Sequence, residues 1–191
     1  MRTVKEPTVR KQEILDGAIR VFAKYGYEKA TISTIAKELK ISQGLCYRYF
    51  PSKEDIYRAA VEKYTDMILE GYRSAWQEEK PIREWIGGIS DSFGRLAEVE
   101  TRDENLYALF HGSNSEQLHK DLMLRGAEKI LPHIQEILRK AVEQGEIRLE
   151  NPDGVAIIGL YGELGTLFTK GLTQEERMAT IRMGWERLLG L

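Results

Sequence analysis

Apolar side chains recur along most of the chain with the spacing of helices. From Val9 to Tyr25 they follow the i, i+4, i+7 pattern of one helical face, and Gly26 is suited to a C-terminal cap. Two short helices are expected next, with Thr31 and Ser42 as their N-caps. Since no segment of useful length alternates with the period of a strand, the pattern predicts an all-α fold.

Longer helices are expected in the rest of the chain. Ser52 is suited to cap a helix that extends toward residue 76, and further helices begin near Pro81, near residue 103 and near residue 115. The helix from residue 115 should kink or break at Pro132, because proline removes a backbone donor and crowds residue 128. Asn151 and Thr173 are the expected N-caps of the last two helices, so the chain should hold about nine helices in all.

Composition is that of a globular protein with a real core, since 42% of the 191 residues are hydrophobic. The single cysteine cannot form an internal disulfide, and the polar N-terminus lacks the apolar region of a signal peptide. These features predict a cytoplasmic protein. The longest apolar stretch without a charge, Val155 to Gly162, is far shorter than the ~20 residues of a membrane span, so no membrane partner is expected.

Charge is divided unevenly along the chain, although its net value is only -2. Residues 1–50 hold ten Lys and Arg against five Asp and Glu, whereas the rest holds eighteen against twenty-five. The excess of basic residues in the first quarter indicates that only this end binds a polyanion, although a chance distribution of charges on a solvated surface could give the same excess. Arg2, Lys5, Arg10 and Lys11 are suited either to an arm on DNA or to a solvated tail.

The segment TISTIAKELKISQGLCYRYFPSKE, residues 31–54, has the pattern of a helix-turn-helix. Two short helices that cross steeply need a small residue where their backbones approach, and Ala36 supplies it. Leu39, Ile41 and Cys46 are spaced to fill the wedge between the helices. The second helix is therefore expected to present its other side chains to a ligand.

Four positions of that second helix point outward, namely Gln43, Gly44, Tyr47 and Arg48. In a major groove an arginine pairs with guanine O6 and N7, and a glutamine pairs with adenine N6 and N7. The hydroxyl of Tyr47 and the ammonium of Lys53 are suited to phosphates. The segment thus predicts sequence-specific binding to double-stranded DNA.

The same segment resembles the DNA-binding domain of the TetR family of bacterial transcriptional repressors. The family pattern is matched in order by Thr31, Ile35, Ala36, Ile41, Ser42, Gly44, Tyr47, Tyr49, Phe50, Lys53 and Glu54. The resemblance implies a three-helix DNA-binding domain over residues 1–52 and a helical effector-binding and dimerisation domain over residues 53–191. It also implies that a homodimer binds a palindromic operator, with DNA contacts from Thr31, Ser42, Gln43, Gly44, Tyr47, Arg48 and Lys53.

Two positions depart from the family pattern. Lys40 stands where the family usually has glycine, and a non-glycine residue with positive φ in this turn costs ~1 kcal/mol. Cys46 replaces the usual leucine, and it is interpreted as a smaller core residue, with a thiol sensor as the alternative.

The helix that begins after Asn151 is apolar on two sides, and a domain of this size rarely has spare helices to cover both. A partner chain is the expected cover, while burial within one subunit is the alternative. Small residues on one side would let a second helix approach closely. The expected dimer interface consists of Val155, Ile158, Gly159, Gly162, Gly165, Met178, Ile181 and Trp185.

Aromatic and methionine side chains are frequent on the helices expected between residues 53 and 144. In the TetR family these helices surround an effector cavity, and such walls suit an apolar or aromatic small molecule. Packing within the core is the alternative role. The candidate effector-binding residues are Tyr64, Met67, Trp85, Phe93, Tyr107 and Phe110.

Enzymatic and metal chemistry have little support. His111, His119 and His133 lack the spacing of metal ligands, and there is no glycine-rich phosphate loop, nucleophile elbow or pair of carboxylates. We therefore expect no enzyme, metal or cofactor. The sequence predicts a ligand-responsive repressor, with a DNA-binding scaffold that has no effector as the alternative.

Overall fold

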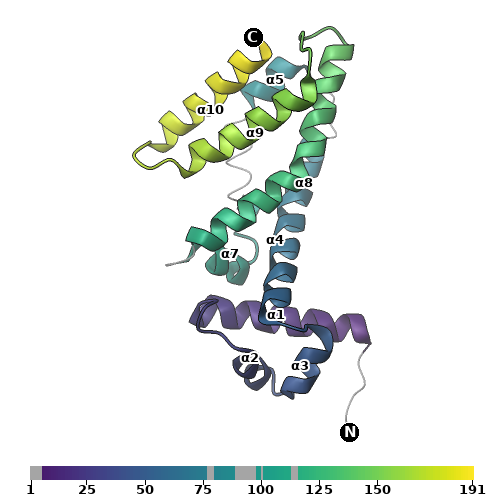
Figure 1. Cartoon of the computed structure of the whole chain (residues 1–191), viewed down its shortest axis with the longest axis vertical. Coiled ribbons are helices and arrows are strands. Elements are labelled where there is room, and N and C mark those ends of the chain that lie inside the picture. The colour runs from purple at the N-terminus through teal and green to yellow at the C-terminus, as the bar shows by residue number, and fades with distance from the viewer. Residues whose placement is uncertain (1–5, 77–79, 89–97, 100, 113–115) are drawn as a thin grey trace. The chain divides into compact units, whose positions relative to one another are not determined.

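The structure, a computed structural model, describes residues 6–76, 80–88, 98–99, 101–112 and 116–191, and every regular element in these ranges is helical (Figure 1). The prediction of an all-α chain with about nine helices is confirmed for these residues. In chain order the helices are α1 (Pro7–Tyr25), α2 (Ile32–Glu38), α3 (Gln43–Tyr49), α4 (Lys53–Trp76), α5 (Ile82–Gly87), α7 (Glu104–His111), α8 (Glu116–Glu143), α9 (Pro152–Phe168) and α10 (Gln174–Leu189).

Side-chain caps begin the helices where the sequence predicts them. The hydroxyls of Thr31 and Ser42 accept hydrogen bonds from backbone N–H groups in the first turns of α2 and α3, at 3.1 and 3.2 Å. Asn151 caps α9 in the same way, and Thr173 opens α10 with a capping box. The sequence predicts that the helix kinks or breaks at Pro132, and α8 does not break there, since it is one helix with Pro132 inside it.

The chain forms two compact units. Unit 1 comprises residues 1–67 and 100–122, and unit 2 comprises residues 68–99 and 123–191. Both α4 and α8 therefore contribute residues to each unit. The compact units do not divide at residue 52. A DNA-binding domain over residues 1–52 and an effector-binding and dimerisation domain over residues 53–191 stay a prediction.

In unit 1, α1 packs against α2 and α7, and it lies above α2 and α3 in Figure 1. The α1 side chains Ile14, Ala18 and Phe22 are completely buried. A Cβ atom added at Gly17 would lie 2.4 Å from the side chain of Leu39, so the backbone of α1 approaches the end of α2 closely. This packing holds the two short helices on the side of α1.

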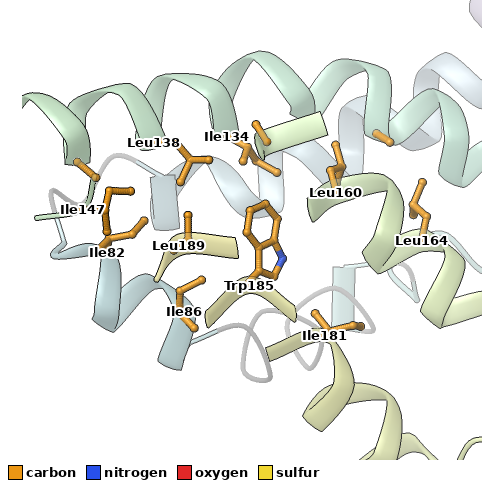
Figure 2. Close-up of a cluster of buried hydrophobic side chains, with 13 residues drawn as sticks. Ile82, Ile86, Ile134, Leu138, Ile147, Leu160, Leu164, Ile181, Trp185 and Leu189 are labelled. Carbon is orange, nitrogen blue, oxygen red and sulfur yellow. The ribbon is translucent and has the colours of Figure 1, made fainter. Parts of the chain in front are cut away.

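In unit 2, a hydrophobic cluster gathers side chains from α5, α8, α9 and α10 around the indole of Trp185 (Figure 2). Trp185 meets the ring of Trp85 edge to face, with centroids 5.5 Å apart. Its Nε1–H donates a hydrogen bond to Glu163 at 3.1 Å. Gly159 faces the edge of the same indole. The indole thus fixes how α9 packs along α10.

No helix among the residues that the structure describes has the length and apolar character that crossing a membrane requires.

Candidate nucleic-acid interface

The turn between α2 and α3 has the hydrogen bonds of a Schellman motif. The N–H of Ile41 donates to the carbonyl of Ala36 at 3.0 Å, and the N–H of Lys40 donates to that of Lys37 at 3.1 Å. Lys40 has φ 54°, and it is the one non-glycine residue with positive φ among those described. The expectation that this turn places a lysine in a conformation favouring glycine is confirmed.

The outward face of α3 carries the side chains predicted to meet DNA. Gln43, Gly44, Tyr47 and Arg48 are all exposed, and Tyr47 retains 50% of its accessible surface. The Nε2 amide of Gln43 donates to the hydroxyl of Ser33 on α2 at 3.2 Å. One amide N–H and the amide oxygen of Gln43 are not used by this bond, and those two groups are what pairing with adenine requires.

The inward face of α3 is anchored by Cys46, which is completely buried. Burial raises the pKa of its thiol, which opposes formation of the thiolate needed for redox chemistry. The geometry fits the interpretation of Cys46 as a packing residue.

The remaining expected DNA contacts lie at the starts of helices. Thr31 and Ser42 are exposed and cap α2 and α3. Lys53, in the first turn of α4, donates to the carbonyl oxygen of Tyr27 at 3.1 Å and lies 4.2 Å from the centroid of its ring. An ammonium has three N–H donors, so this contact orients Lys53 and leaves capacity for a phosphate oxygen.

The basic arm considered at the N-terminus is described only in part. Arg2 and Lys5 lie outside the described residues, whereas Arg10 pairs with Glu13 at 2.8 Å. Lys11 lies 5.4 Å from the ring centroid of Phe50. A role of the arm in DNA binding stays a prediction.

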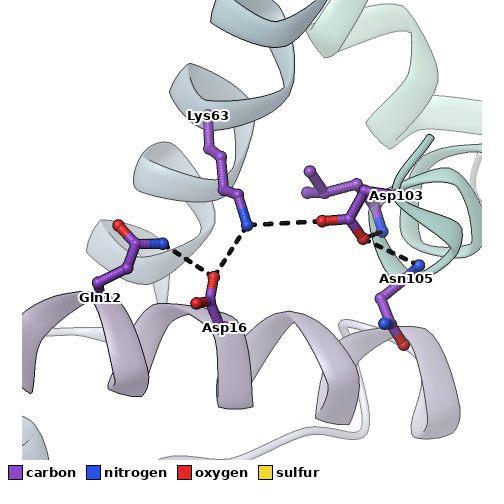
Figure 3. Close-up of polar contacts among 6 residues, drawn as sticks. Gln12, Asp16, Lys63, Asp103 and Asn105 are labelled. Carbon is purple, nitrogen blue, oxygen red and sulfur yellow. Dashed lines mark hydrogen bonds and ion pairs between the residues drawn. The ribbon is translucent and has the colours of Figure 1, made fainter. Parts of the chain in front are cut away.

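A polar network that the sequence analysis missed joins three helices of unit 1 (Figure 3). The ammonium of Lys63 on α4 lies 2.9 Å from Asp16 on α1 and 3.5 Å from Asp103, the N-cap of α7. Burial lowers the pKa of Lys63, but the hydrogen bonds and charges of the two carboxylates outweigh it and raise the pKa overall. No local sequence pattern indicates the network, because its three charges are far apart along the chain.

Four of the candidate effector-binding residues lie in unit 1. Tyr64 and Phe110 are completely buried and stack with ring centroids 5.3 Å apart. Met67 is partly buried. Tyr107 is exposed and stacks on His111 at 4.4 Å. The structure therefore brings Tyr64 and Phe110 into direct contact.

The other two candidates are placed differently. Trp85 belongs to unit 2, where it packs on Trp185, and Phe93 lies outside the described residues. A single effector site made from all six residues stays a prediction.

Two histidines that are eight positions apart in the sequence meet in unit 1. The rings of His111 and His119 have centroids 4.4 Å apart. Burial, and then the charge of His119, lowers the pKa of His111 to about 4, and burial also lowers that of His119. Both imidazoles are therefore neutral at pH 7. Across the described part of the chain, no three His, Cys, Asp or Glu side chains are grouped so that they could hold a metal ion.

The expected dimer residues divide into two sets. Gly159, Ile181 and Trp185 are buried within the single chain, where a Cβ on Gly159 would come within 2.3 Å of the indole. The close helix approach expected at Gly159 therefore occurs between α9 and α10 of one subunit. At this position the structure agrees with burial within one subunit rather than with cover by a partner chain. The dimer interface stays a prediction.

Of the other five expected dimer residues, three are exposed and two are partly buried. Ile158 is 62% exposed, and Gly162 and Gly165 are exposed. Val155 and Met178 are partly buried and pack against the hydrophobic cluster of the same chain. Three further apolar side chains that were not among the candidates are also exposed on these helices: Ile157, Tyr161 and Met183. Apolar surface is therefore exposed on α9 at Ile157, Ile158 and Tyr161, and on α10 at Met183.

Comparison with known proteins agrees with this geometry. Residues 14–60, which span most of α1, all of α2 and α3 and the start of α4, match the bacterial regulatory proteins of the tetR family. The N-terminal helices of the chain therefore form a DNA-binding domain of the TetR family. The chain is 24% identical to the HTH-type transcriptional regulator SrpR of Pseudomonas putida over 181 residues, which cover 94% of this chain and 83% of SrpR.

Solved structures extend the likeness in fold beyond the N-terminal helices. Salmonella enterica GusR aligns with a TM-score of 0.63 at 22% identity, covering 98% of this chain and 99% of GusR. FadR from Bacillus subtilis, solved in complex with stearoyl-CoA, aligns with a TM-score of 0.58 at 24% identity, covering 93% and 97% of the two chains. These alignments show a shared fold.

Proposed function

We propose that this protein is a cytoplasmic repressor of the TetR family that binds a palindromic operator as a homodimer and is released by an apolar or aromatic small molecule. The observation that carries the proposal is the row of exposed Gln43, Gly44, Tyr47 and Arg48 on α3. Residues 1–52 would bind DNA, and residues 53–191 would bind the effector and form the dimer.

Base recognition is assigned to Gln43 and Arg48, and backbone contacts to Tyr47 and Lys53. The absence of a side chain at Gly44 lets the backbone of α3 approach the bases. Gln43 is held by Ser33, so less side-chain entropy is lost when it pairs with a base. Tyr47 and Lys53 bear groups that reach phosphate oxygens and carry no base preference.

Dimerisation is assigned to the apolar surface exposed on α9 and α10. Ile158 at 62% exposure and Met183 at 54% are large apolar side chains that gain from being covered. Gly162 and Gly165 have open space where a Cβ would stand, so a second helix could approach them closely. Two DNA-binding heads joined in this way meet two half-sites, which is why the operator should be palindromic.

Effector binding is assigned to the aromatic residues of unit 1, with Tyr64 and Phe110 at the centre. FadR, which shares the fold, was solved with stearoyl-CoA, a ligand with a long apolar chain. Aromatic and methionine side chains can contact a long apolar ligand as well as a small aromatic one. A ligand that binds the DNA-free form better weakens operator binding by the ratio of its two affinities.

The experiment for DNA binding begins by sequencing the fragments that the purified protein retains from its own genome. Titrations on the retained duplex and on a scrambled duplex then compare Arg48→Ala with Lys53→Ala. We expect Arg48→Ala to cost ~1–3 kcal/mol on the retained duplex and to relax base preference, and Lys53→Ala to weaken both duplexes alike. If Lys53→Ala changes base preference and Arg48→Ala does not, the assignment is wrong.

The experiment for the effector is a screen of hydrophobic compounds by tryptophan fluorescence. The affinity of each compound that binds is then measured with and without the retained duplex. We expect a coupling of ~1–3 kcal/mol, equal in both directions because linkage is reciprocal. Compounds whose affinity is indifferent to DNA would favour a DNA-binding scaffold without an effector.

A further inference from the structure

Four lysines surround one shallow hollow beside α2, which we call the lysine groove. The hollow has a volume of about 870 Å³, and Lys24, Lys29, Lys37 and Lys40 line it together with Ser33 and Thr34. All four lysines are exposed. They come from the end of α1, the segment before α2, α2 itself and the turn after it, so the fold gathers charges that are spread over 17 positions of sequence.

The positive charge of the groove exceeds the negative charge that lines it. Glu38 is the one acidic residue in its lining, against four lysines. The side-chain hydrogen bond of Lys24 with Tyr25, and then the negative charge of Glu38, raise the pKa of Lys24. Lysine side chains are charged at neutral pH, so all four ammonium groups of the groove carry their charge. The groove is therefore a strongly cationic surface with hydroxyl donors inside it.

The groove is continuous with the face of α3 that is assigned to DNA. Ser33 lines the groove and accepts the hydrogen bond from Gln43, the first residue of α3. A duplex bound to Gln43 on α3 would therefore lie close to Ser33, which lines the same hollow as the four lysines. A polyanion with regularly spaced charges suits lysines spread along a shallow surface, because each ammonium acts as a point charge.

We propose that the lysine groove binds the sugar-phosphate backbone of duplex DNA outside the base pairs that α3 reads. This inference rests on the proposed DNA binding, and it adds a second contact that is independent of sequence. Such a contact extends the footprint of each head and increases the salt dependence of binding. It also keeps the protein on DNA of any sequence, which shortens the search for an operator.

The test compares two triple variants of the full chain. One variant carries Lys24→Gln, Lys29→Gln and Lys37→Gln. The control carries Lys140→Gln, Arg148→Gln and Lys170→Gln, which remove the same charge from exposed positions of unit 2. Affinity for a 40-base-pair duplex of scrambled sequence is measured over a range of salt concentrations, and circular dichroism verifies that each variant is folded.

We expect the groove variant to lower the slope of log K against log salt by about 2–3, since each lost phosphate contact removes about 0.9. Its affinity at 0.1 M salt should fall more than about tenfold, while the control stays within about threefold of the wild type. The single variant Lys37→Gln should lower the slope by about 0.9, which gives a milder change if the triple variant folds poorly.

Two results would overturn the inference in different ways. A wild-type protein that binds the scrambled duplex with the same slope as the groove variant excludes the lysine groove as a DNA contact and leaves DNA binding through α3 intact. A wild-type protein that binds neither the scrambled duplex nor any genomic fragment overturns the proposed function together with the groove.

Discussion

Replacement of Gly159 by alanine tests the packing of α9 on α10 most directly. The added Cβ would lie 2.3 Å from Cη2 and 2.5 Å from Cζ3 of Trp185, whereas carbon atoms in contact are about 3.5–4.0 Å apart. The indole would have to retreat by more than about 1 Å. It is held by its hydrogen bond to Glu163 and by the ring of Trp85, so retreat disturbs both contacts.

The expected magnitude follows from two opposing effects. Overpacking of a tight core costs ~1–3 kcal/mol, while alanine in place of glycine inside a helix gains ~1 kcal/mol. Because Trp185 is almost completely buried and cannot move into solvent, we expect overpacking at the upper end of its range. The net loss of unfolding free energy for Gly159→Ala should then be ~1–2 kcal/mol.

The assay is guanidinium unfolding at one fixed protein concentration, with Gly126→Ala as the matched control. Gly126 lies inside α8 and has no atom within 4 Å of its added Cβ, so alanine there should stabilise the fold by ~0.5–1 kcal/mol. The two glycine-to-alanine changes should thus have opposite signs. If Gly159→Ala is as stable as Gly126→Ala, the reasoning about the close approach is refuted.

Three further predictions concern pH and assembly. Burial raises the pKa of Glu163 to about 7, so protonated Glu163 adds roughly 3 kcal/mol to the free energy of unfolding below the unfolded-state pKa, and this stability is lost as pH rises through 7. Glu163→Gln should abolish this loss in unfolding curves between pH 5 and 8, and an unchanged pH dependence would contradict the prediction. Burial and then the charge of His119 lower the pKa of His111 to about 4, so the free energy of unfolding is highest above the unfolded-state pKa of the imidazole and falls as pH drops through 4. His111→Phe should move the midpoint of acid unfolding to lower pH, and a midpoint that stays or rises would show that protonation of His111 does not drive acid unfolding. Gly162→Arg places a charge on the exposed apolar surface of α9 and should give a helical monomer in sedimentation, whereas a persistent dimer would place the interface elsewhere.

Helix ends and the helix-turn-helix were predictable because their signals are local. The hydroxyl of Thr31 or Ser42 bonds a backbone N–H only three residues onward, so the residue type and its place before an apolar run are sufficient. The strained turn at Lys40 was predictable from the resemblance to the TetR family, because the family usually has glycine at this position. The exposure of Gln43 and Arg48 follows from the period of α3, once Cys46 is assigned to the core.

Long-range packing was not predictable in the same way. Periodicity marks both sides of α9 as apolar, but it does not tell which side meets α10 of the same chain. Gly159 and Trp185 are 26 positions apart, and nothing near either residue indicates the other. The lysine groove was not predictable for a related reason. The excess of basic residues is evident in the sequence, but only the folded structure shows that four of them line one hollow.

Lys40 has a consequence for how such a chain can change over generations. A lysine with φ 54° carries a strain of ~1 kcal/mol, whereas glycine at the same position would increase the entropy of the unfolded chain by a comparable ~0.4–1 kcal/mol. The two effects nearly cancel, so exchange between lysine and glycine is close to neutral for folding. A mutation of this single codon can therefore change the positive charge of the helix-turn-helix, and so its attraction for a polyanion, with little effect on the stability of the fold.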